Sequence, residues 1–335
     1  MLPLPRFGLA EPRTVAEATR ILSELGDGAV LMAGGTDLLP NMKHGLVEPR
    51  TVVSLQRVEG LRDVRYEPGA DGGRLHLGAM ATLDAVASNE LVCRLAPALA
   101  QAAQAVAGPH HRRMGTLGGN LCLDTRCRYF NQTHFWRSAL GFCLKKDGSV
   151  CHVVAGGQRC VAAASNDTAP AVIALEGSLV LESARGRRTL DVSSFYTADG
   201  VYNTTRERDE ILVEVVLPVR PGRKSGFEKL RRRAAIDFPL LSIAARVDDD
   251  ATDLRNVAAI DIVVSALAAR PRRLGAAQKV AAGVPRSPAL VETLANASHR
   301  ECHPLENIEG DAEWRREMVP VLVRRLLHRL FELPG

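Results

Sequence analysis

Five of the seven cysteines of this 335-residue chain lie within residues 119–160. They are Cys122, Cys127, Cys143, Cys151 and Cys160, separated by four, fifteen, seven and eight residues. Only the first pair has the short spacing typical of structural zinc sites, and the closely spaced run of bacterial ferredoxins is absent. Because long loops can also bring four thiolates together, the spacing leaves an iron–sulfur cluster open.

The same segment contains two histidines and five aromatic residues, which leave further alternatives open. His134 and His152 could complete a Cys/His zinc site. The aromatic residues could cover the apolar side of a cluster, or they could form a small core that holds a long loop together. They are Tyr129, Phe130, Phe135, Trp136 and Phe142.

Two glycine-bearing turns form a second group of candidate residues. "AGGTDLLPN" (33–41) follows an apolar run, and "GTLGGN" (115–120) follows "GPHHRRM". Adjacent glycines let a ligand approach the backbone, and turn N–H groups with a threonine hydroxyl can hold a pyrophosphate. Neither turn is a dinucleotide fingerprint or a P-loop, so each could be a plain tight turn. Together they could hold one long ligand from both sides.

Composition and charge narrow the function classes. The net charge is +5, with acidic residues scattered among the basic ones and no arginine run interleaved with aromatics, so we expect no nucleic-acid partner. No run approaches the ~20 apolar residues of a membrane span, and the N-terminus lacks an apolar signal-peptide run. We expect a cytoplasmic protein, in which clustered cysteines are more often metal ligands or redox groups than disulfides.

The hydrophobic pattern predicts an α+β fold of several units. Thr14 and Glu17 form a capping box for a helix that stops at Gly26. We expect further helices over 95–108, 287–298 and 319–333. Strands are expected over 28–35, 51–55, 74–83 (half-buried), 178–183, 188–192, 210–218, 227–233, 240–247 and 258–267. These give a small α/β unit over 1–57, a mixed domain over 58–218 and a C-terminal α+β domain over 224–332.

Four motifs in order resemble the FAD-binding medium subunits of the xanthine dehydrogenase family of molybdenum hydroxylases. They are "LMAGGTDLLPNMKHG", "TLGGN", "SNDTAPAVIAL" and "FEKLRRRAAIDFPL", and "AEWRREMVPVLVRRLL" is similar to that family's final helix. The resemblance covers nearly the whole chain. It implies that residues 1–57 and 58–218 are two FAD-binding subdomains with FAD extended between them.

The resemblance also implies which residues contact FAD. The first pyrophosphate loop is Leu31, Met32, Ala33, Gly34, Gly35, Thr36, Asp37 and Leu38, and the second is Thr116, Gly118, Gly119 and Asn120. Asp167 matches an aspartate at the flavin cleft, and Lys229 matches a lysine close to the flavin; Asp237 lies in a similar motif. Asp167 could instead be a helix N-cap, and Lys229 a solvated strand residue.

The same resemblance implies that residues 124–164 are an insertion relative to most members of the family. A flavin subunit with a four-cysteine insertion resembles the β subunits of 4-hydroxybenzoyl-CoA reductases, in which the insertion binds a [4Fe–4S] cluster. An added cofactor should bring its own ligands, so the expected ligands are Cys127, Cys143, Cys151 and Cys160. Cys122 in place of Cys127 stays open as an alternative.

This resemblance implies an electron-transfer subunit. Reduced ferredoxin would deliver electrons to the cluster, and FAD would pass them to a [2Fe–2S] small subunit and a molybdenum-cofactor large subunit. There the phenolic hydroxyl of 4-hydroxybenzoyl-CoA would be removed reductively. The resemblance also implies a dimer of heterotrimers. The alternatives are the FAD subunit of an oxidative molybdenum hydroxylase with a zinc-stabilised insertion, and a non-catalytic scaffold subunit.

Overall fold

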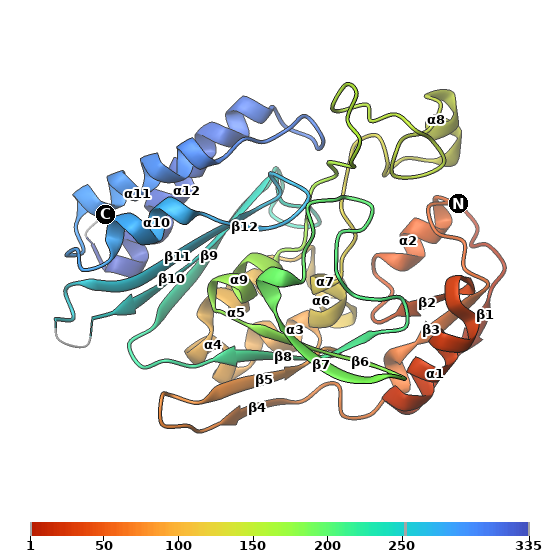
Figure 1. Ribbon diagram of the computed structural model, residues 1–335, viewed down its shortest axis with the longest axis horizontal. Coiled ribbons are helices and arrows are strands. Elements are labelled where there is room, and N and C mark those ends of the chain that lie inside the picture. Colours follow the sequence, from red (N-terminus) through yellow and green to blue (C-terminus); the bar gives the residue numbers. More distant parts are fainter. Residues whose placement is uncertain (1, 251–252, 334–335) are drawn as a thin grey trace.

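The computed structural model describes residues 2–250 and 253–333. Residue 1, where the expected first unit begins, lies outside the described residues, as do 251–252 of the expected C-terminal domain and 334–335. Three sheets organise the chain, each with its own helices (Figure 1), and the expected α+β fold class is confirmed. Within the described residues, no helix is both long and apolar enough to span a membrane.

The first sheet is small and parallel, with the order β1-β3-β2. Its elements are β1 (Gly8–Ala10), α1 (Val15–Leu25), β2 (Ala29–Met32), α2 (Leu38–Lys43) and β3 (Thr51–Ser54). Thr14 caps α1 by accepting from Glu17 N, and Gly26 ends it at φ 50°, as the sequence predicts. The expected strand after the helix is β2, whose carboxyl end leads directly into the first glycine loop.

The second sheet is antiparallel, with the order β4-β5-β8-β6-β7, and short helices pack on it. Its strands are β4 (Val64–Glu67), β5 (Arg74–Gly78), β6 (Ser178–Ser183), β7 (Gly186–Asp191) and β8 (Ile211–Pro218). The helices of this part of the chain are α3 (Leu83–Ser88), α4 (Glu90–Leu95), α5 (Pro97–Gln104), α6 (Pro109–Met114), α7 (Leu117–Leu121), α8 (His134–Ala139) and α9 (Thr168–Ala174).

One burial expectation is wrong in β5. The alternation of Leu75 and Leu77 predicts a strand with one solvated face, but His76 between them is also buried. Its ring nitrogens lie 3.0 Å from Glu67 Oε2 and 3.1 Å from Glu214 Oε1, on the two neighbouring strands. Cross-strand carboxylates therefore cover the polar face of this strand.

The third sheet is antiparallel, with the order β12-β11-β10-β9, and three helices cover one of its faces (Figure 1). Its strands are β9 (Lys224–Leu230), β10 (Leu241–Asp249), β11 (Val257–Ser265) and β12 (Arg272–Arg273). The helices are α10 (Gly275–Ala281), α11 (Pro288–Glu301) and α12 (Ala312–Phe331). On the side away from these helices, α9 and α5 contact β9, β10 and β11, which joins the second and third sheets.

The cysteine segment leaves the second sheet region after α7 and returns before α9. It contains little regular structure apart from α8, and a pair of backbone hydrogen bonds between Arg126 and Ala163 closes its two ends. In Figure 1 it stands beside α2 of the first unit. Arg137, whose side chain is 1% exposed, donates to Gly45 O at 3.1 Å and fixes the segment against that unit.

Candidate functional site

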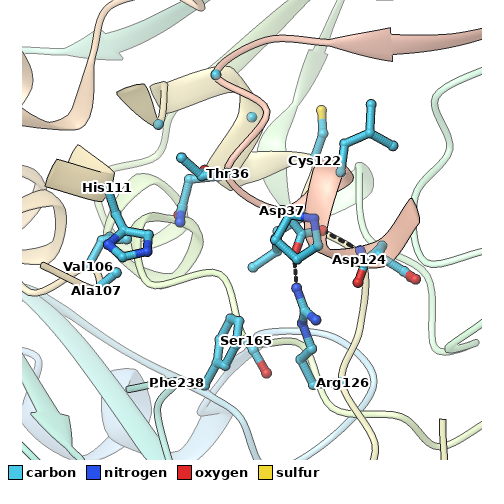
Figure 2. A pocket seen from close by; sticks show the side chains of 18 of the residues that line it. Thr36, Asp37, Val106, Ala107, His111, Cys122, Asp124, Arg126, Ser165 and Phe238 are labelled. Carbon is cyan, nitrogen blue, oxygen red and sulfur yellow. Dashed lines mark hydrogen bonds and ion pairs between the residues drawn. The ribbon is translucent and has the colours of Figure 1, made fainter. Parts of the chain in front are cut away.

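A large cavity lies where the three units and the cysteine segment meet (Figure 2). Its volume is about 770 Å³, and both glycine loops line it. The predicted FAD-contacting residues that line it are Leu31, Met32, Ala33, Gly34, Gly35, Thr36, Asp37, Leu38, Thr116, Gly118, Gly119, Asn120 and Asp167. Lys229 does not line the cavity; it lies behind Asp167. The structure thus brings together two loops that are about 80 residues apart in the sequence.

The first glycine loop fits tightly against the second. A Cβ atom on Gly34 would overlap the carbonyl oxygen of Met114, and Gly35 has φ +71°, which favours glycine. Within the described residues, the backbone N–H groups of Gly34, Gly35 and Thr36 have no hydrogen-bond partner. These donors are therefore available to an anionic ligand on the cavity wall.

The second glycine loop is held by hydrogen bonds to its surroundings. Thr116 Oγ1 accepts from Gly119 N at 3.0 Å, and Gly118 N donates to Ala79 O at 2.8 Å. Asn120 Oδ1 accepts from Thr168 N at 3.0 Å and from Thr168 Oγ1 at 2.6 Å. The Asn120 side chain thus caps α9 and fixes the loop as a rigid wall of the cavity.

Asp167 and Lys229 form a buried ion pair between α9 and β9. Lys229 Nζ lies 2.7 Å from Asp167 Oδ2, and the two side chains are 3% and 4% exposed. Burial raises the pKa of Asp167, while the Lys229 ammonium opposes that shift. Asp167 is the N-cap residue of α9, as the alternative has it, although its side chain makes no capping bond. The alternative that Lys229 is a solvated strand residue is wrong.

Several cavity residues carry no signal in the sequence. Arg126 forms an ion pair with Asp37, and its guanidinium lies 4.4 Å from the ring centroid of Phe238 (Figure 2). These residues come from the cysteine segment, the first loop and the connection between β9 and β10. Burial lowers the pKa of Arg126 to about 10. The sequence offered one indication that Arg126 contributes to the cavity: it directly precedes the predicted cluster ligand Cys127 and follows the second glycine loop by six residues.

Three of the predicted cluster ligands are buried in one group. Cys127, Cys143 and Cys160 pack together with Leu46 and Phe130. Burial raises the pKa of the Cys127 thiol to about 11; the Tyr129 N–H opposes this, and the nearby thiols of Cys160 and Cys143 add to it.

The fourth predicted ligand, Cys151, is half-buried and is not part of that packed group. Burial raises the pKa of Cys160, the Ala162 N–H and Lys145 lower it, and Cys143 and Cys151 raise it. Cys151 is therefore within electrostatic reach of Cys160. Cys122 packs against the core of the second sheet and also lines the cavity; burial raises its pKa, and Arg206 opposes the shift.

Neither a Cys/His zinc site nor a preformed site of the four predicted cysteine ligands is found among the described residues. Within residues 2–250 and 253–333, no group of three or more His, Cys, Asp or Glu side chains is arranged to hold a metal ion. His152 contacts Phe142 O at 2.6 Å, and its ring lies 5.3 Å from that of Tyr129. His134 packs edge-on against the Phe142 ring, 5.6 Å away. Neither histidine completes a Cys/His set.

The aromatic residues of the cysteine segment differ in burial. Phe130 is buried among the cysteines, and Tyr129 packs against the same group. Phe135 is 82% exposed and Trp136 37% exposed on α8, so neither of these two is buried in a core. α8 is a short helix, and the Trp136 ring lies 6.4 Å from that of Tyr129.

Comparison with known proteins gives the family. The sequence matches the family model of the FAD binding domain in molybdopterin dehydrogenase over residues 5–220. Residues 225–330 match the CO dehydrogenase flavoprotein C-terminal domain. The two matches together cover nearly all of the chain.

Individual relatives align over their full length. The carbon monoxide dehydrogenase medium chain of Hydrogenophaga pseudoflava is 29% identical over 331 residues, 98% of each chain. The nicotine 6-hydroxylase medium subunit of Paenarthrobacter nicotinovorans is 28% identical, over 97% of this chain and 98% of that one. Neither is a 4-hydroxybenzoyl-CoA reductase, so that finer expectation stays a prediction.

A solved structure agrees with these sequence matches. It is carbon monoxide dehydrogenase from Hydrogenophaga pseudoflava lacking the Mo-pyranopterin moiety of its cofactor. A chain of it superposes with a TM-score of 0.80 at 28% identity, covering 98% of this chain and 99% of that one. The chain described here therefore belongs to the FAD-binding medium subunits of the molybdenum hydroxylase family, which includes the xanthine and carbon monoxide dehydrogenases.

Proposed function

We propose that this chain carries both FAD and a [4Fe–4S] cluster and transfers electrons within a molybdenum enzyme complex. One observation carries the proposal: Cys127 lines the cavity between the glycine loops and also belongs to the buried cysteine group. A side chain shared by both candidate sites supports a short distance between two cofactors bound there. Close spacing of this kind is what an electron-transfer subunit requires.

The cavity residues fit FAD. The unpaired N–H groups of Gly34, Gly35 and Thr36 are donors for a pyrophosphate, and the close contact of Gly34 with Met114 keeps that wall narrow. The apolar side chains of Leu31, Met32 and other residues that line the cavity suit a flavin ring. When bound, FAD exchanges one or two electrons, while the protein positions it and excludes solvent.

The cysteine group supplies thiols of the kind that hold iron–sulfur clusters, since Cys127, Cys143 and Cys160 are buried together. Cys160 Sγ accepts an N–H···S hydrogen bond from Ala162 N at 3.5 Å. Such bonds tune iron–sulfur potentials.

We propose the reductive 4-hydroxybenzoyl-CoA reaction as the reaction of the whole complex. The resemblance of the segment 119–160 to the β subunits of 4-hydroxybenzoyl-CoA reductases supports it. The complex would include a molybdenum-cofactor large subunit and a [2Fe–2S] small subunit, arranged as a dimer of heterotrimers. Reduced ferredoxin would be its electron donor. This chain would perform no chemistry on the substrate itself.

An oxidative molybdenum hydroxylase is the second candidate. The names of the aligned relatives, carbon monoxide dehydrogenase and nicotine 6-hydroxylase, favour it. The two candidates share the FAD cavity and differ in the role of the cysteine segment, because the oxidative candidate has no need of an added cluster there.

Metal and sulfide analysis of the anaerobically purified complex tests the cluster. The Cys143→Ser variant should lose about four iron and four sulfide per FAD relative to the parent complex, together with one reduced-cluster EPR signal. Cys302→Ala is the matched control, since Cys302 is buried in the third unit, away from the segment. Equal iron content in parent and Cys143→Ser complexes would refute the cluster.

An activity assay separates the two candidates. With reduced ferredoxin and 4-hydroxybenzoyl-CoA, the complex should form benzoyl-CoA. Absence of that product, together with oxidation of an aromatic or aldehyde substrate by an added acceptor, would favour the oxidative hydroxylase.

A further inference from the structure

Lys145 is a buried lysine at the centre of the cysteine segment. Its side chain is 5% exposed, and its ammonium contacts four oxygen atoms. Nζ lies 2.6 Å from Thr125 Oγ1, 2.6 Å from Gly200 O, 2.7 Å from Asp124 Oδ1 and 3.4 Å from Thr125 O. A flexible lysine in so polar and closed an environment is held in one place.

These contacts connect Lys145 to three of the proposed ligands. Lys145 itself follows Cys143 by two residues. Gly200 donates its N–H to Cys160 O at 2.8 Å, and a Cβ on Gly200 would lie 2.7 Å from Cys160 Sγ.

The third connection runs through Phe130. Lys145 Nζ lies 4.7 Å from the centroid of the Phe130 ring, and the Phe130 N–H donates to Cys127 O at 3.0 Å. One ammonium thus joins the chain segments that carry Cys127, Cys143 and Cys160.

We infer that Lys145 is a positioning residue for the proposed cluster, holding the cysteine loop closed and placing a fixed positive charge beside it. The inference rests on the proposed [4Fe–4S] site. A cluster with four thiolates carries negative charge, and a nearby buried ammonium favours its reduced form over its oxidised form. Lys145 therefore raises the reduction potential of the cluster and slows the loss of its iron.

The charge part of the inference is tested with an opposed pair of substitutions in the purified complex. Lys145→Met keeps the apolar stem but removes the charge, so an EPR-monitored redox titration should give a more negative cluster potential. Asp124→Asn removes the opposing charge with little change in shape, so the potential should become more positive. A merely structural role would not move the two variants in opposite directions.

Lys146→Met is the matched control. Lys146 is the next residue, and its ammonium lies 4.0 Å from Asp147 Oδ1 with a side chain that is 31% exposed. The reduction potential of the cluster in the Lys146→Met complex should stay near that in the parent complex. Shifts of the same sign in Lys145→Met and Asp124→Asn, or a shift in Lys146→Met as large as that in Lys145→Met, would overturn the charge role.

A separate measurement tests whether Lys145 holds the cysteine loop closed, which we call its clamp role. Iron release to a chelator should be roughly tenfold faster or more in Lys145→Met, as for other residues that orient metal ligands. In iron-free protein, thiol labelling should also be faster in Lys145→Met than in Lys146→Met. Equal labelling rates would overturn the clamp. Absence of iron from the parent complex would refute the proposed cluster, and the labelling comparison would still decide the clamp.

Discussion

Lys229 Nζ and Asp167 Oδ2 are 2.7 Å apart, on β9 and at the start of α9, and solvent reaches almost none of either side chain. Lys229 also donates to Ala105 O and Asp237 O, both at 3.0 Å. Ser242 Oγ lies 3.3 Å from Asp167 Oδ1. The pair thus joins the second and third sheets at the wall of the flavin cavity.

Breaking this pair should destabilise the protein. Asp167→Asn leaves the Lys229 ammonium buried without a counter-charge, and removal of one partner from such a pair costs about 3–5 kcal/mol. Urea denaturation should show that loss in the free energy of unfolding. Asp63→Asn, at an exposed aspartate, is the control and should change it by less than about 0.5 kcal/mol. Equal effects of the two substitutions would contradict a structural role for the pair.

Gly34→Ala should disrupt FAD binding. The new methyl group overlaps Met114 O, so the two glycine loops must separate, and overpacking of this kind costs about 1–3 kcal/mol. The bound flavin per protein should fall, as measured by absorbance after gel filtration. Gly275→Ala is the control, because nothing lies within 4 Å of the position of its new Cβ. Full flavin occupancy in Gly34→Ala would show that the loops do not need this contact.

Arg223 should make the joint between the second and third sheets sensitive to acid. It lies 2.7 Å from both Glu176 Oε2 and Asp248 Oδ1. Burial would raise the pKa of both carboxyls, but Arg223 and Arg246 outweigh it, so the pKa values lie below 4.5 for Glu176 and below 3.8 for Asp248. Groups with a lowered pKa stabilise the fold above their unfolded pKa, and this contribution is lost as the pH falls through the folded values.

The parent protein should therefore lose stability steeply below about pH 4.5, and Arg223→Met should show a flatter dependence from a lower starting point. Melting temperatures measured from pH 7 to pH 3 check this. Arg187→Met removes an exposed pair with Glu182 and should follow the parent curve. Parallel curves for the parent and Arg223→Met would contradict the assignment.

Cys127 and Cys122 should differ in iron binding. Cys127 is buried with Cys143 and Cys160. The Cys122 thiol instead contributes to the raised pKa of the buried Tyr196 hydroxyl, and Arg206 lowers the pKa of Cys122. Cys127→Ser should lose about four iron per FAD, and Cys122→Ala should keep its iron. The reverse result would make Cys122 the ligand and Cys127 a buried neighbour of the flavin cavity.

Local signals in the sequence were sufficient for the longer elements. Thr14 and Gly26 set the ends of α1, and apolar runs marked β2, β3, β10 and β11. Among the described residues, seven helices of five to seven residues were not predicted: α2, α3, α4, α6, α7, α8 and α10. So short a helix has too few turns to show a periodic pattern and depends on packing for its stability.

By itself, the sequence determined the residue types at the candidate sites: two glycine loops and a segment rich in cysteine. The tertiary structure decided which of these residues meet. Asp167 and Lys229 are 62 residues apart in the chain, and Lys145 and Gly200 are 55 apart, yet each pair is in contact. Contacts at such separations depend on how sheets and loops pack together. Local sequence patterns report only the conformation of neighbouring residues, so they could not specify these pairs.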